Sequence, residues 1–174
     1  MKLWLLDADV IIDLLSLNSL DSLVKNHKVF AASTVIEEVK FFKRNHEKVS
    51  IDFRKHYVAN GLLNELSASI DEIAGILDQI PDNARDTIDA GELESLAILI
   101  KEESLIFCSC DSAVIRILPI LNISERGISV EKLLKSSGLQ SSDLKERHTE
   151  HYFQNNLAIG KKNKIYSFDP KKEK

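Results

Sequence analysis

Short apolar runs alternate with longer segments of helical periodicity over most of the chain. Apolar runs rich in β-branched and aromatic residues are typical of buried strands, whereas apolar positions three and four apart indicate amphipathic helices. Because strands that alternate with helices form βαβ units, the pattern predicts an α/β fold on a mainly parallel sheet. The predicted strands are residues 2–6, 28–32, 105–109 and, more weakly, 122–129. The predicted helices are residues 10–17, 34–44, 51–77 (a two-helix arm broken near Asn60 and Gly61), 91–102, 112–118 and 130–135.

The pattern weakens after Gly138, where the sequence predicts one further helix and a loose tail that ends in KKEK. We therefore expect a domain over residues 1–139, followed by a C-terminal helix and basic tail over residues 140–174. A chain of 174 residues with 44% hydrophobic and 29% charged residues is long enough and apolar enough for one core.

The composition argues against membrane insertion and against export. The opening MKLWLLDADV places an aspartate inside its apolar run, which is untypical of a signal peptide. The apolar runs are all shorter than a membrane-spanning helix requires. Cys108 and Cys110 lie two positions apart on a predicted strand, and we expect them to be core residues. The sequence thus predicts a cytoplasmic protein with no membrane partner.

Charge is distributed unevenly along the chain. The net charge is -4, and acids dominate residues 63–99, whereas residues 40–56 and the tail are basic. Such asymmetry permits a phosphate-facing side on an acidic protein, although a charged run is also typical of a solvated helix face. Phe41 and Tyr57 could stack on bases there, while Phe42 and Phe53 are expected in the core.

Two aspartates stand at the ends of predicted strands. Asp7 ends the first strand, and Asp111 in LIFCSCD ends the third. In parallel sheets, ligands bind beyond the carboxyl ends of the strands, so both carboxylates are expected at one edge. Each aspartate also suits the N-cap of the following helix, and that structural alternative stays open.

Two glutamates lie at the apolar faces of the neighbouring predicted helices. Helical rotation places Glu38 beside the apolar face of ASTVIEEV and points Glu37 away from it. The same projection places Glu92 of DAGELESLAI within the apolar arc and Glu94 on the other side. Asp89 and Glu92 also form a D-x-x-E capping box, so Glu92 has a structural alternative too.

Four carboxylates around one pocket would repel one another unless a cation binds between them. Mg²⁺ and Mn²⁺ prefer oxygen ligands and keep waters that a phosphate can replace. The combination of these two aspartates and two glutamates therefore predicts a divalent-metal site suited to displacement at phosphorus.

At this point the chain resembles the PIN-domain ribonucleases. The resemblance rests on LLDADVIIDLL, ASTVIEEV, DAGELESLAI and LIFCSCD in that order, with GISVEKLLKSSGL resembling a frequent family ending. It implies a three-layer α/β/α sandwich with a four- to five-stranded PIN-like sheet. It also implies a Mg²⁺- or Mn²⁺-dependent endoribonuclease acting on single-stranded RNA, such as the toxin of a toxin–antitoxin pair. An antitoxin protein and a second copy of the chain, as a homodimer, are the partners it implies.

By matching position, the resemblance implies that Asp7, Glu38, Glu92 and Asp111 are catalytic and bind the metal. Asp9 and Glu94 would be auxiliary acids, and Ser109 a polar support. Asp9 departs from the family, which often has Asn or Ser there, and the segment after Leu139 has no matching counterpart.

Two other readings remain open. DADVI also resembles the start of haloacid-dehalogenase-type phosphatases, in which Asp7 would be the nucleophile and Asp9 the acid or base. The chain shows no second aspartate after CSCD and no evident cap domain. A PIN fold that binds RNA or protein without cleavage is the other alternative. His148 and His151 have metal-like spacing but are expected to be exposed on a polar terminal helix.

Overall fold

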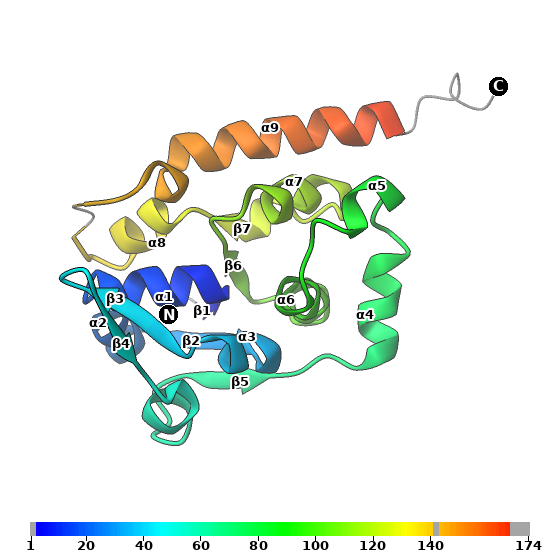
Figure 1. Cartoon of the computed structure of the whole chain (residues 1–174). Helices are drawn as coiled ribbons and strands as arrows, with labels where there is room; N and C mark the ends of the chain where they lie inside the picture. Colours follow the sequence, from blue (N-terminus) through cyan, green and yellow to red (C-terminus); the bar gives the residue numbers. More distant parts are fainter. Residues whose placement is uncertain (1–2, 141–142, 168–174) are drawn as a thin grey trace.

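A five-stranded parallel sheet forms the centre of the computed structural model, which describes residues 3–140 and 143–167 (Figure 1). Helices cover both faces, so the predicted three-layer α/β/α sandwich is confirmed. Lys2 and the basic tail beyond residue 167, which the sequence analysis included, lie outside the described residues. In spatial order the strands are β5 (Asn64–Leu66), β2 (Lys28–Ala32), β1 (Leu3–Leu6), β6 (Ile106–Cys108) and β7 (Gly127–Ile128).

The strand order reverses next to β1. The chain runs from β1 outward to β2 and β5, and then returns to the other side of β1 to form β6 and β7. Leu5 is paired with Phe30 of β2 on one side and with Phe107 of β6 on the other. The carboxyl ends of β1 and β6 lie at this reversal, which is the place where open α/β sheets bind ligands.

The helices predicted over residues 10–17, 91–102, 112–118 and 130–135 are present, with boundaries shifted by at most two residues. The sequence analysis did not predict α2 or α5. Short 3₁₀ turns occur at Ser124–Arg126, within the weak strand predicted at 122–129, and at Glu146–His148. The helices are α1 (Ala8–Ser16), α2 (Leu20–Asn26), α3 (Ser33–Glu38), α4 (Ile70–Leu77), α5 (Asp82–Arg85), α6 (Ala90–Lys101), α7 (Ser112–Ile120), α8 (Val130–Ser136) and α9 (Glu150–Ser167).

The C-terminal helix α9 runs alongside α7 and shares the core (Figure 1). Phe153 and Leu157 are buried with the apolar residues of residues 1–139. At Gly160 the helix backbones approach so closely that a Cβ atom would lie 2.3 Å from the carbonyl oxygen of Arg116. Helix α9 therefore packs as part of the helical layer that contains α7.

The helix predicted over residues 34–44 is wrong in its second half. Helix α3 ends at Glu38, and an antiparallel hairpin follows, with strands β3 (Phe41–Arg44) and β4 (Glu47–Ser50). Its two loop residues, Asn45 and His46, both have positive φ, which is the geometry of a type I′ turn. Alternation of exposed Phe41 with buried Phe42 is the local signal of a strand.

The two-helix arm predicted over residues 51–77 is also wrong. Only Ile70–Leu77 forms an α-helix, which begins with a Ser69/Glu72 capping box. The first part contains a π-helical turn at Arg54–Val58, followed by the short edge strand β5. Strand β5 is held by parallel pairing with β2, an interaction that no local pattern in Asn64–Leu66 indicates.

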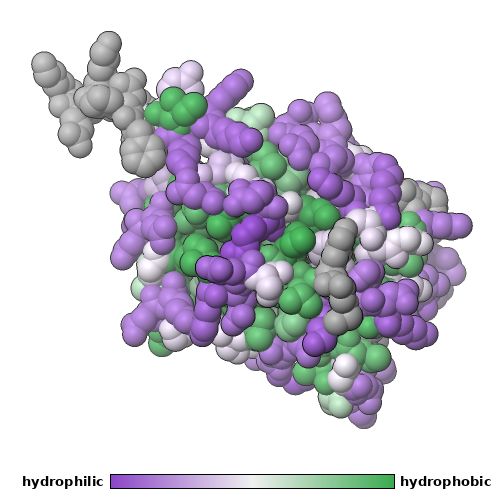
Figure 2. All heavy atoms as spheres, turned by 180° about the vertical axis from the view of Figure 1, so that it is seen from behind, coloured by the Kyte–Doolittle hydropathy of each residue, from purple (hydrophilic) through white to green (hydrophobic). Residues whose placement is uncertain are grey.

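Apolar side chains fill the space between the sheet and its helices, with Trp4, Leu5 and Phe107 among the fully buried ones. Cys108 and Cys110 are buried free thiols, as predicted. Seen from behind, the surface is mostly polar, with apolar side chains showing between polar ones (Figure 2). Among the described residues, no helix is both long and apolar enough to cross a membrane.

Candidate active site

Asp7 lies directly after β1, at the point where the strand order reverses. Its Oδ1 accepts a hydrogen bond from the Ala8 N–H at 2.7 Å, and its Oδ2 accepts one from the Ser109 hydroxyl at 2.9 Å. Only 4% of Asp7 is exposed. Burial raises the pKa of Asp7 to about 7 against these hydrogen bonds, and the negative charges of Asp89 and Asp9 raise it further. Near neutral pH this carboxyl group is therefore poised between its two protonation states.

Asp111 occupies the matching position after β6. Its Oδ1 caps α7 by accepting hydrogen bonds from the N–H groups of Ala113 at 2.6 Å and Val114 at 3.2 Å. Its own N–H donates to the Ser109 hydroxyl at 3.1 Å. Ser109 thus joins the two strand ends, which agrees with the supporting position expected for it. The capping role and the edge position predicted for Asp111 are both present in one residue.

Glu92 closes the capping box of α6 and is also part of an acidic cluster. The members of this cluster are Asp7, Glu38, Asp89, Glu92 and Asp111. Its Oε2 accepts the Asp89 N–H at 2.9 Å, while the Glu92 N–H donates to Asp89 Oδ1 at 2.8 Å. Burial raises the pKa of Glu92 to about 8 against the Asp89 hydrogen bond, and repulsion from Asp7, Asp89 and Asp111 adds to the shift. The structural and site interpretations of Glu92 are therefore compatible.

Glu38 reaches the same cluster from the end of α3. Gly91 allows this approach, because a Cβ atom on Gly91 would lie 3.0 Å from Glu38 Oε1 and 3.2 Å from Val35 Cγ2. Partial burial raises the pKa of Glu38, and the charges of Asp89 and Asp9 add to the increase. Glu37 points outward, where it forms an exposed ion pair with Arg54 at 3.8 Å.

Asp89 was missed as a member of the cluster because the sequence analysis assigned it only to a helix cap. Its charge raises the pKa of Asp7, of Glu38 and of Glu92, so it lies among all three. The D-x-x-E motif could have indicated that Asp89 belongs to the cluster, because a cap residue at the start of α6 must lie beside Glu92.

The carboxylates of the cluster are the type of ligand that a hard divalent cation prefers. Among the described residues, however, three ligand atoms within 4.8 Å of one another occur only at Asp13, Cys110 and His148. Asp111 Oδ2 and Glu92 Oε1 have no hydrogen-bond donor within residues 3–140 and 143–167. Both oxygens belong to carboxylates in the cluster, and Asp7 lies among these charges. Oxygen ligands with unsatisfied lone pairs and mutual repulsion are what Mg²⁺ or Mn²⁺ would stabilise.

Glu94, expected as an auxiliary acid, has a different set of contacts. Its carboxylate accepts the Thr34 N–H at 2.9 Å, the Ala68 N–H at 3.2 Å and the Ser33 hydroxyl at 3.2 Å. Glu94 is 5% exposed, so the interpretation of it as a solvated acid, which its position away from the apolar arc favoured, is wrong. These bonds tie α6 to the first turn of α3 and to the segment before α4, so Glu94 supports the elements that carry Glu38 and Glu92.

A second network of charged residues borders the cluster on α1. Asp13 accepts hydrogen bonds from Lys145 Nζ at 2.7 Å, from His148 Nε2 at 2.7 Å and from Arg147. Although burial opposes ionisation, these bonds from His148, Lys145 and Arg147 hold the pKa of Asp13 well below its usual range. The prediction that His148 is exposed is wrong, since it is 1% exposed in the turn before α9; His151 is exposed as expected.

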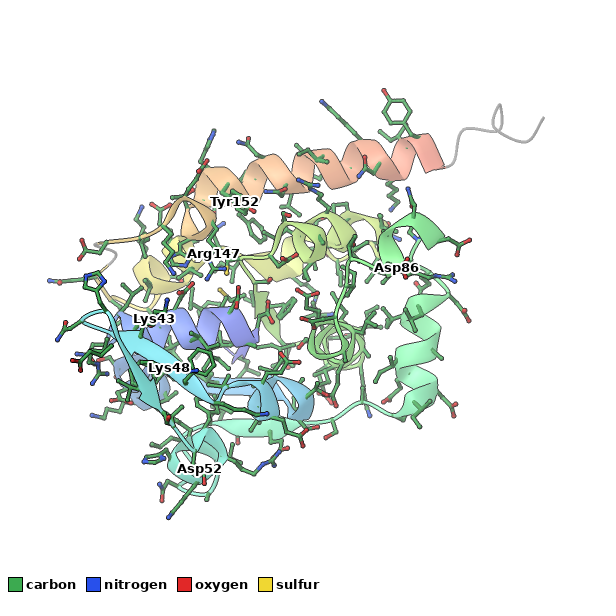
Figure 3. The ribbon with its side chains drawn as sticks, in the orientation of Figure 1. Lys43, Lys48, Asp52, Asp86, Arg147 and Tyr152 are labelled. Carbon is green, nitrogen blue, oxygen red and sulfur yellow. The ribbon has the colours of Figure 1, made fainter. Side chains whose placement is uncertain are left out.

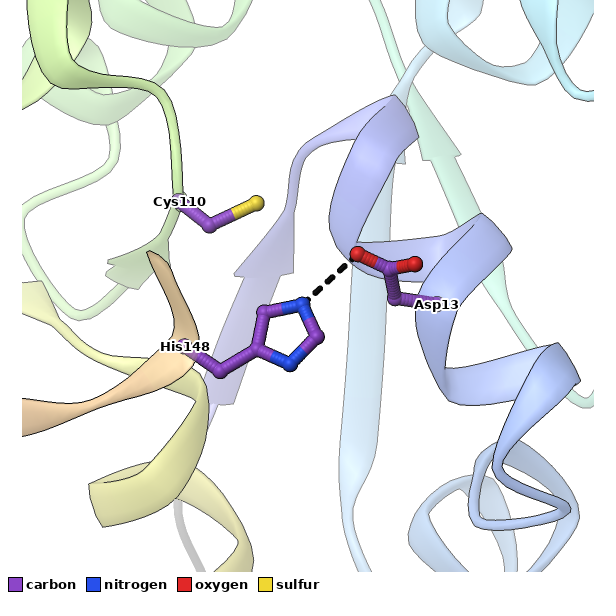
Figure 4. Close-up of side chains that lie close together, drawn as sticks. All are labelled: Asp13, Cys110 and His148. Atoms are coloured by element: carbon purple, nitrogen blue, oxygen red, sulfur yellow. Dashed lines mark hydrogen bonds and ion pairs between the residues drawn. The ribbon is translucent and has the colours of Figure 1, made fainter. Parts of the chain in front are cut away.

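Asp13, Cys110 and His148 form a buried group that could hold a metal ion, because their ligand atoms lie within 4.8 Å of one another (Figure 4). The hydrogen bonds indicate that protons and cationic side chains, rather than a metal ion, occupy these ligand atoms. His148 Nδ1 accepts the Lys145 N–H at 3.2 Å, so Nε2 carries the proton that is donated to Asp13. Burial also raises the pKa of the Cys110 thiol well above its usual range. The cations of Lys145 and Arg147 already neutralise Asp13.

Arg147 connects this network to the acidic cluster. Its Nη1 donates to Asp9 Oδ2 at 2.6 Å while its other amino group binds Asp13, so one guanidinium bridges two aspartates of α1. Asp9 is exposed, and Arg147 of the C-terminal segment neutralises its charge. The sequence analysis missed Asp13 and Arg147, whose partners lie more than a hundred positions away in the chain.

The basic segment 40–56 forms the exposed side of the β3–β4 hairpin and the turn after it. Lys43 and Lys48 extend from the hairpin (Figure 3). Phe42 and Phe53 are buried, as predicted, and Tyr57 is buried as well. Phe41 remains 40% exposed, with Lys48 Nζ 3.7 Å from the centre of its ring. Of the aromatic residues considered for base stacking, Phe41 is therefore the accessible one.

Comparison of the sequence with models of known protein families found no match, and comparisons with curated proteins and with solved structures found none either.

Proposed function

We propose that this protein is a metal-dependent endoribonuclease of the PIN-like type that hydrolyses single-stranded RNA. The observation that carries the proposal is the gathering of buried Asp7 and Glu92 with Asp111 where the strand order reverses. Burial and mutual repulsion raise the pKa values of Asp7 and Glu92 to about 7 and about 8. Clustered carboxyl groups with raised pKa values are typical of catalytic and metal sites.

Four carboxylates would hold the metal, namely Asp7, Glu38, Glu92 and Asp111. A bound Mg²⁺ or Mn²⁺ would lower the pKa of a water molecule and stabilise negative charge on the phosphate. Ser109 keeps Asp7 and Asp111 in register by hydrogen bonds to both. The cap bonds of Asp111 and Glu92 fix one oxygen of each carboxylate, so the second oxygen is oriented without extra loss of side-chain freedom.

The choice of nucleic acid as substrate is supported by the basic hairpin. Lys43 and Lys48 supply exposed positive charge on a protein whose net charge is -4. Exposed Phe41 offers a ring on which a base can stack. An unpaired strand is favoured over a duplex because stacking requires splayed bases.

The first test is cleavage of end-labelled single-stranded RNA with Mn²⁺, Mg²⁺ or EDTA. We expect cleavage only with metal, and a loss of about 100-fold or more in Asp111→Asn because one ligand charge is removed. Asparagine keeps the Oδ1 acceptor for the Ala113 and Val114 N–H groups, so α7 should stay capped. Asp71→Asn, at an exposed position of α4, is the matched control.

Full activity in Asp111→Asn, or cleavage unaffected by EDTA, would contradict the proposal. Calorimetric titration with Mn²⁺ gives an independent readout. Wild type and Asp71→Asn should bind the metal alike, whereas Asp111→Asn should bind it more weakly. Equal affinity in all three proteins would show that the metal does not bind at the strand ends.

Gly91→Ala tests the position of Glu38. The new methyl group would meet Glu38 Oε1 at 3.0 Å and should displace that carboxylate by a few tenths of an ångström. Alanine is a better helix former than glycine by about 1 kcal/mol, and this gain opposes the close contact of the new methyl group with buried Val35 Cγ2 at 3.2 Å, so we expect little net change in the free energy of unfolding. We expect weaker Mn²⁺ binding without a loss of thermal stability. Unchanged Mn²⁺ affinity would argue that Glu38 has no part in metal binding.

A further inference from the structure

A groove opens beside the acidic cluster, between α5, the first two turns of α7 and the last turns of α9. Its volume is about 620 Å³, within the range of small-molecule and nucleotide sites. The polar residues that line it are Asn83, Thr87, Ser112, Arg116, Asn163 and Tyr166.

The groove adjoins the candidate active site through two segments of the chain. Ser112 follows Asp111 directly, and Thr87 lies two positions before Asp89. A ligand that extends from the acidic cluster along α7 therefore enters this groove. Its neighbour on that path is the N-terminal turn of α7, whose N–H groups are the positive end of the helix dipole.

The lining differs in charge from the cluster next to it. Within the described part of the chain, no carboxylate side chain lines the groove, and Arg116 supplies a positive charge. Arg116 Nε donates to Asn156 Oδ1 at 2.8 Å, which orients the guanidinium, and its two amino groups have no hydrogen-bond acceptor among residues 3–140 and 143–167. The amide of Asn83 can both donate and accept, as base edges require.

The wall formed by α9 is held firmly in place. Its backbone at Gly160 contacts the backbone of Arg116, and Lys164 Nζ donates to the Pro119 carbonyl at 3.0 Å. Tyr166, one turn beyond Asn163 on the same wall, keeps 64% of its surface exposed. An exposed aromatic ring on a fixed helix is a suitable platform for stacking.

We propose that this groove binds one nucleotide of single-stranded RNA next to the phosphodiester held at the acidic cluster. Tyr166 stacks on the base, Arg116 pairs with the flanking phosphate, and Asn83 contacts the base edge. This inference rests on the proposed ribonuclease function and adds to it the site that receives the neighbouring base. The C-terminal segment thereby becomes part of the substrate-binding surface.

The test is fluorescence anisotropy with a short, mixed-sequence, fluorescein-labelled single-stranded RNA in EDTA, where metal-dependent cleavage is blocked. We expect Tyr166→Ala to weaken binding about 10-fold, because stacking on an aromatic ring contributes that much per base. Ile165→Ala is the matched control, since Ile165 is 70% exposed on the same helix turn and lies outside the groove. It should change the affinity by less than about 2-fold.

The outcomes separate this inference from the function on which it rests. The proposal that the groove binds a nucleotide would be contradicted if wild type and Tyr166→Ala had equal affinities, or if both variants lost affinity equally. This holds even if wild type cleaves RNA in an Asp111-dependent manner. A selective loss in Tyr166→Ala would support the groove, and if wild type then failed to cleave with Mn²⁺, the ribonuclease proposal alone would fail. Thermal unfolding should show the same stability for all three proteins, because both side chains are exposed.

Discussion

Asp7→Asn is expected to stabilise the metal-free protein at about pH 8 while it abolishes metal-dependent cleavage. The folded pKa of Asp7 is about 7, above the ordinary value of 3.8. Protonation of Asp7 therefore stabilises the fold fully below pH 3.8, and this contribution is lost as the pH rises towards about 7. The difference corresponds to up to about 4 kcal/mol at about 1.4 kcal/mol per pKa unit.

Asparagine carries no charge, so it removes the free-energy cost of a buried, ionised carboxylate at this position. Its Oδ1 can still accept the Ala8 N–H, and its amino group can donate to the Ser109 hydroxyl. Thermal unfolding in EDTA from about pH 5 to about pH 8 should show wild type losing stability with pH and Asp7→Asn losing less. At about pH 8 the variant should melt up to about 10 °C higher, because about 1 kcal/mol shifts the melting temperature of a domain this size by about 2 to 4 °C.

Added Mn²⁺ should reverse the order at about pH 8, since it binds the folded wild type and stabilises it by mass action. Asp7→Asn should gain little from the metal and should lose RNA cleavage by about 100-fold or more. Asp71→Asn serves again as the control and should follow wild type in both assays. A melting temperature that does not depend on pH in wild type, or full cleavage by Asp7→Asn, would rule out this account of Asp7.

Asp13→Asn is expected to destabilise the fold by about 3 kcal/mol, because it removes the buried negative charge that two cations share and one of the two oxygens that accept their hydrogen bonds and that of His148. Asp13 is 4% exposed and binds Lys145, Arg147 and His148. The melting temperature should fall by about 6 to 12 °C. Because the folded pKa of Asp13 is lowered, its stabilisation is present above its ordinary pKa of 3.8 and is lost on acidification below that value.

Asp9→Asn provides the matched control for Asp13→Asn. Asp9 binds the same guanidinium of Arg147, but its side chain is 52% exposed, and exposed ion pairs contribute about 1 kcal/mol or less. Urea unfolding at about pH 7 should therefore show a large loss in Asp13→Asn and a small change in Asp9→Asn. Equal effects of the two substitutions would mean that the network around Asp13 does not anchor the C-terminal segment.

Much of the site could be predicted from local sequence. Asp7 and Asp111 follow short apolar strands, and the register of β1 with β6 brings their ends together. Glu38 and Glu92 were selected by helical rotation, which depends only on positions within one helix. The positions of the two aspartates can be inferred in this way because an apolar run ended by a helix-capping aspartate has the same local energetics in any parallel sheet.

Other parts of the site depend on pairs that are remote in the chain. The Ser109–Asp7 bond joins positions 102 apart, and the His148–Asp13 contact joins positions 135 apart. Nothing around His148 in the sequence distinguishes it from exposed His151, so its burial is decided by the packing of the segment before α9. The prediction of an exposed His148 failed for that reason.

What the sequence by itself determined was the α/β class, the strands β1, β2 and β6 and the carboxylates at their ends, because these follow from periodicity and capping within a few residues. Only the tertiary structure decided that Asn64–Leu66 is a strand, that residues 41–50 form a hairpin, and that α9 closes the groove beside Asp111. Backbone pairing between distant segments and the close approach at Gly160 supply free energy that no local window contains.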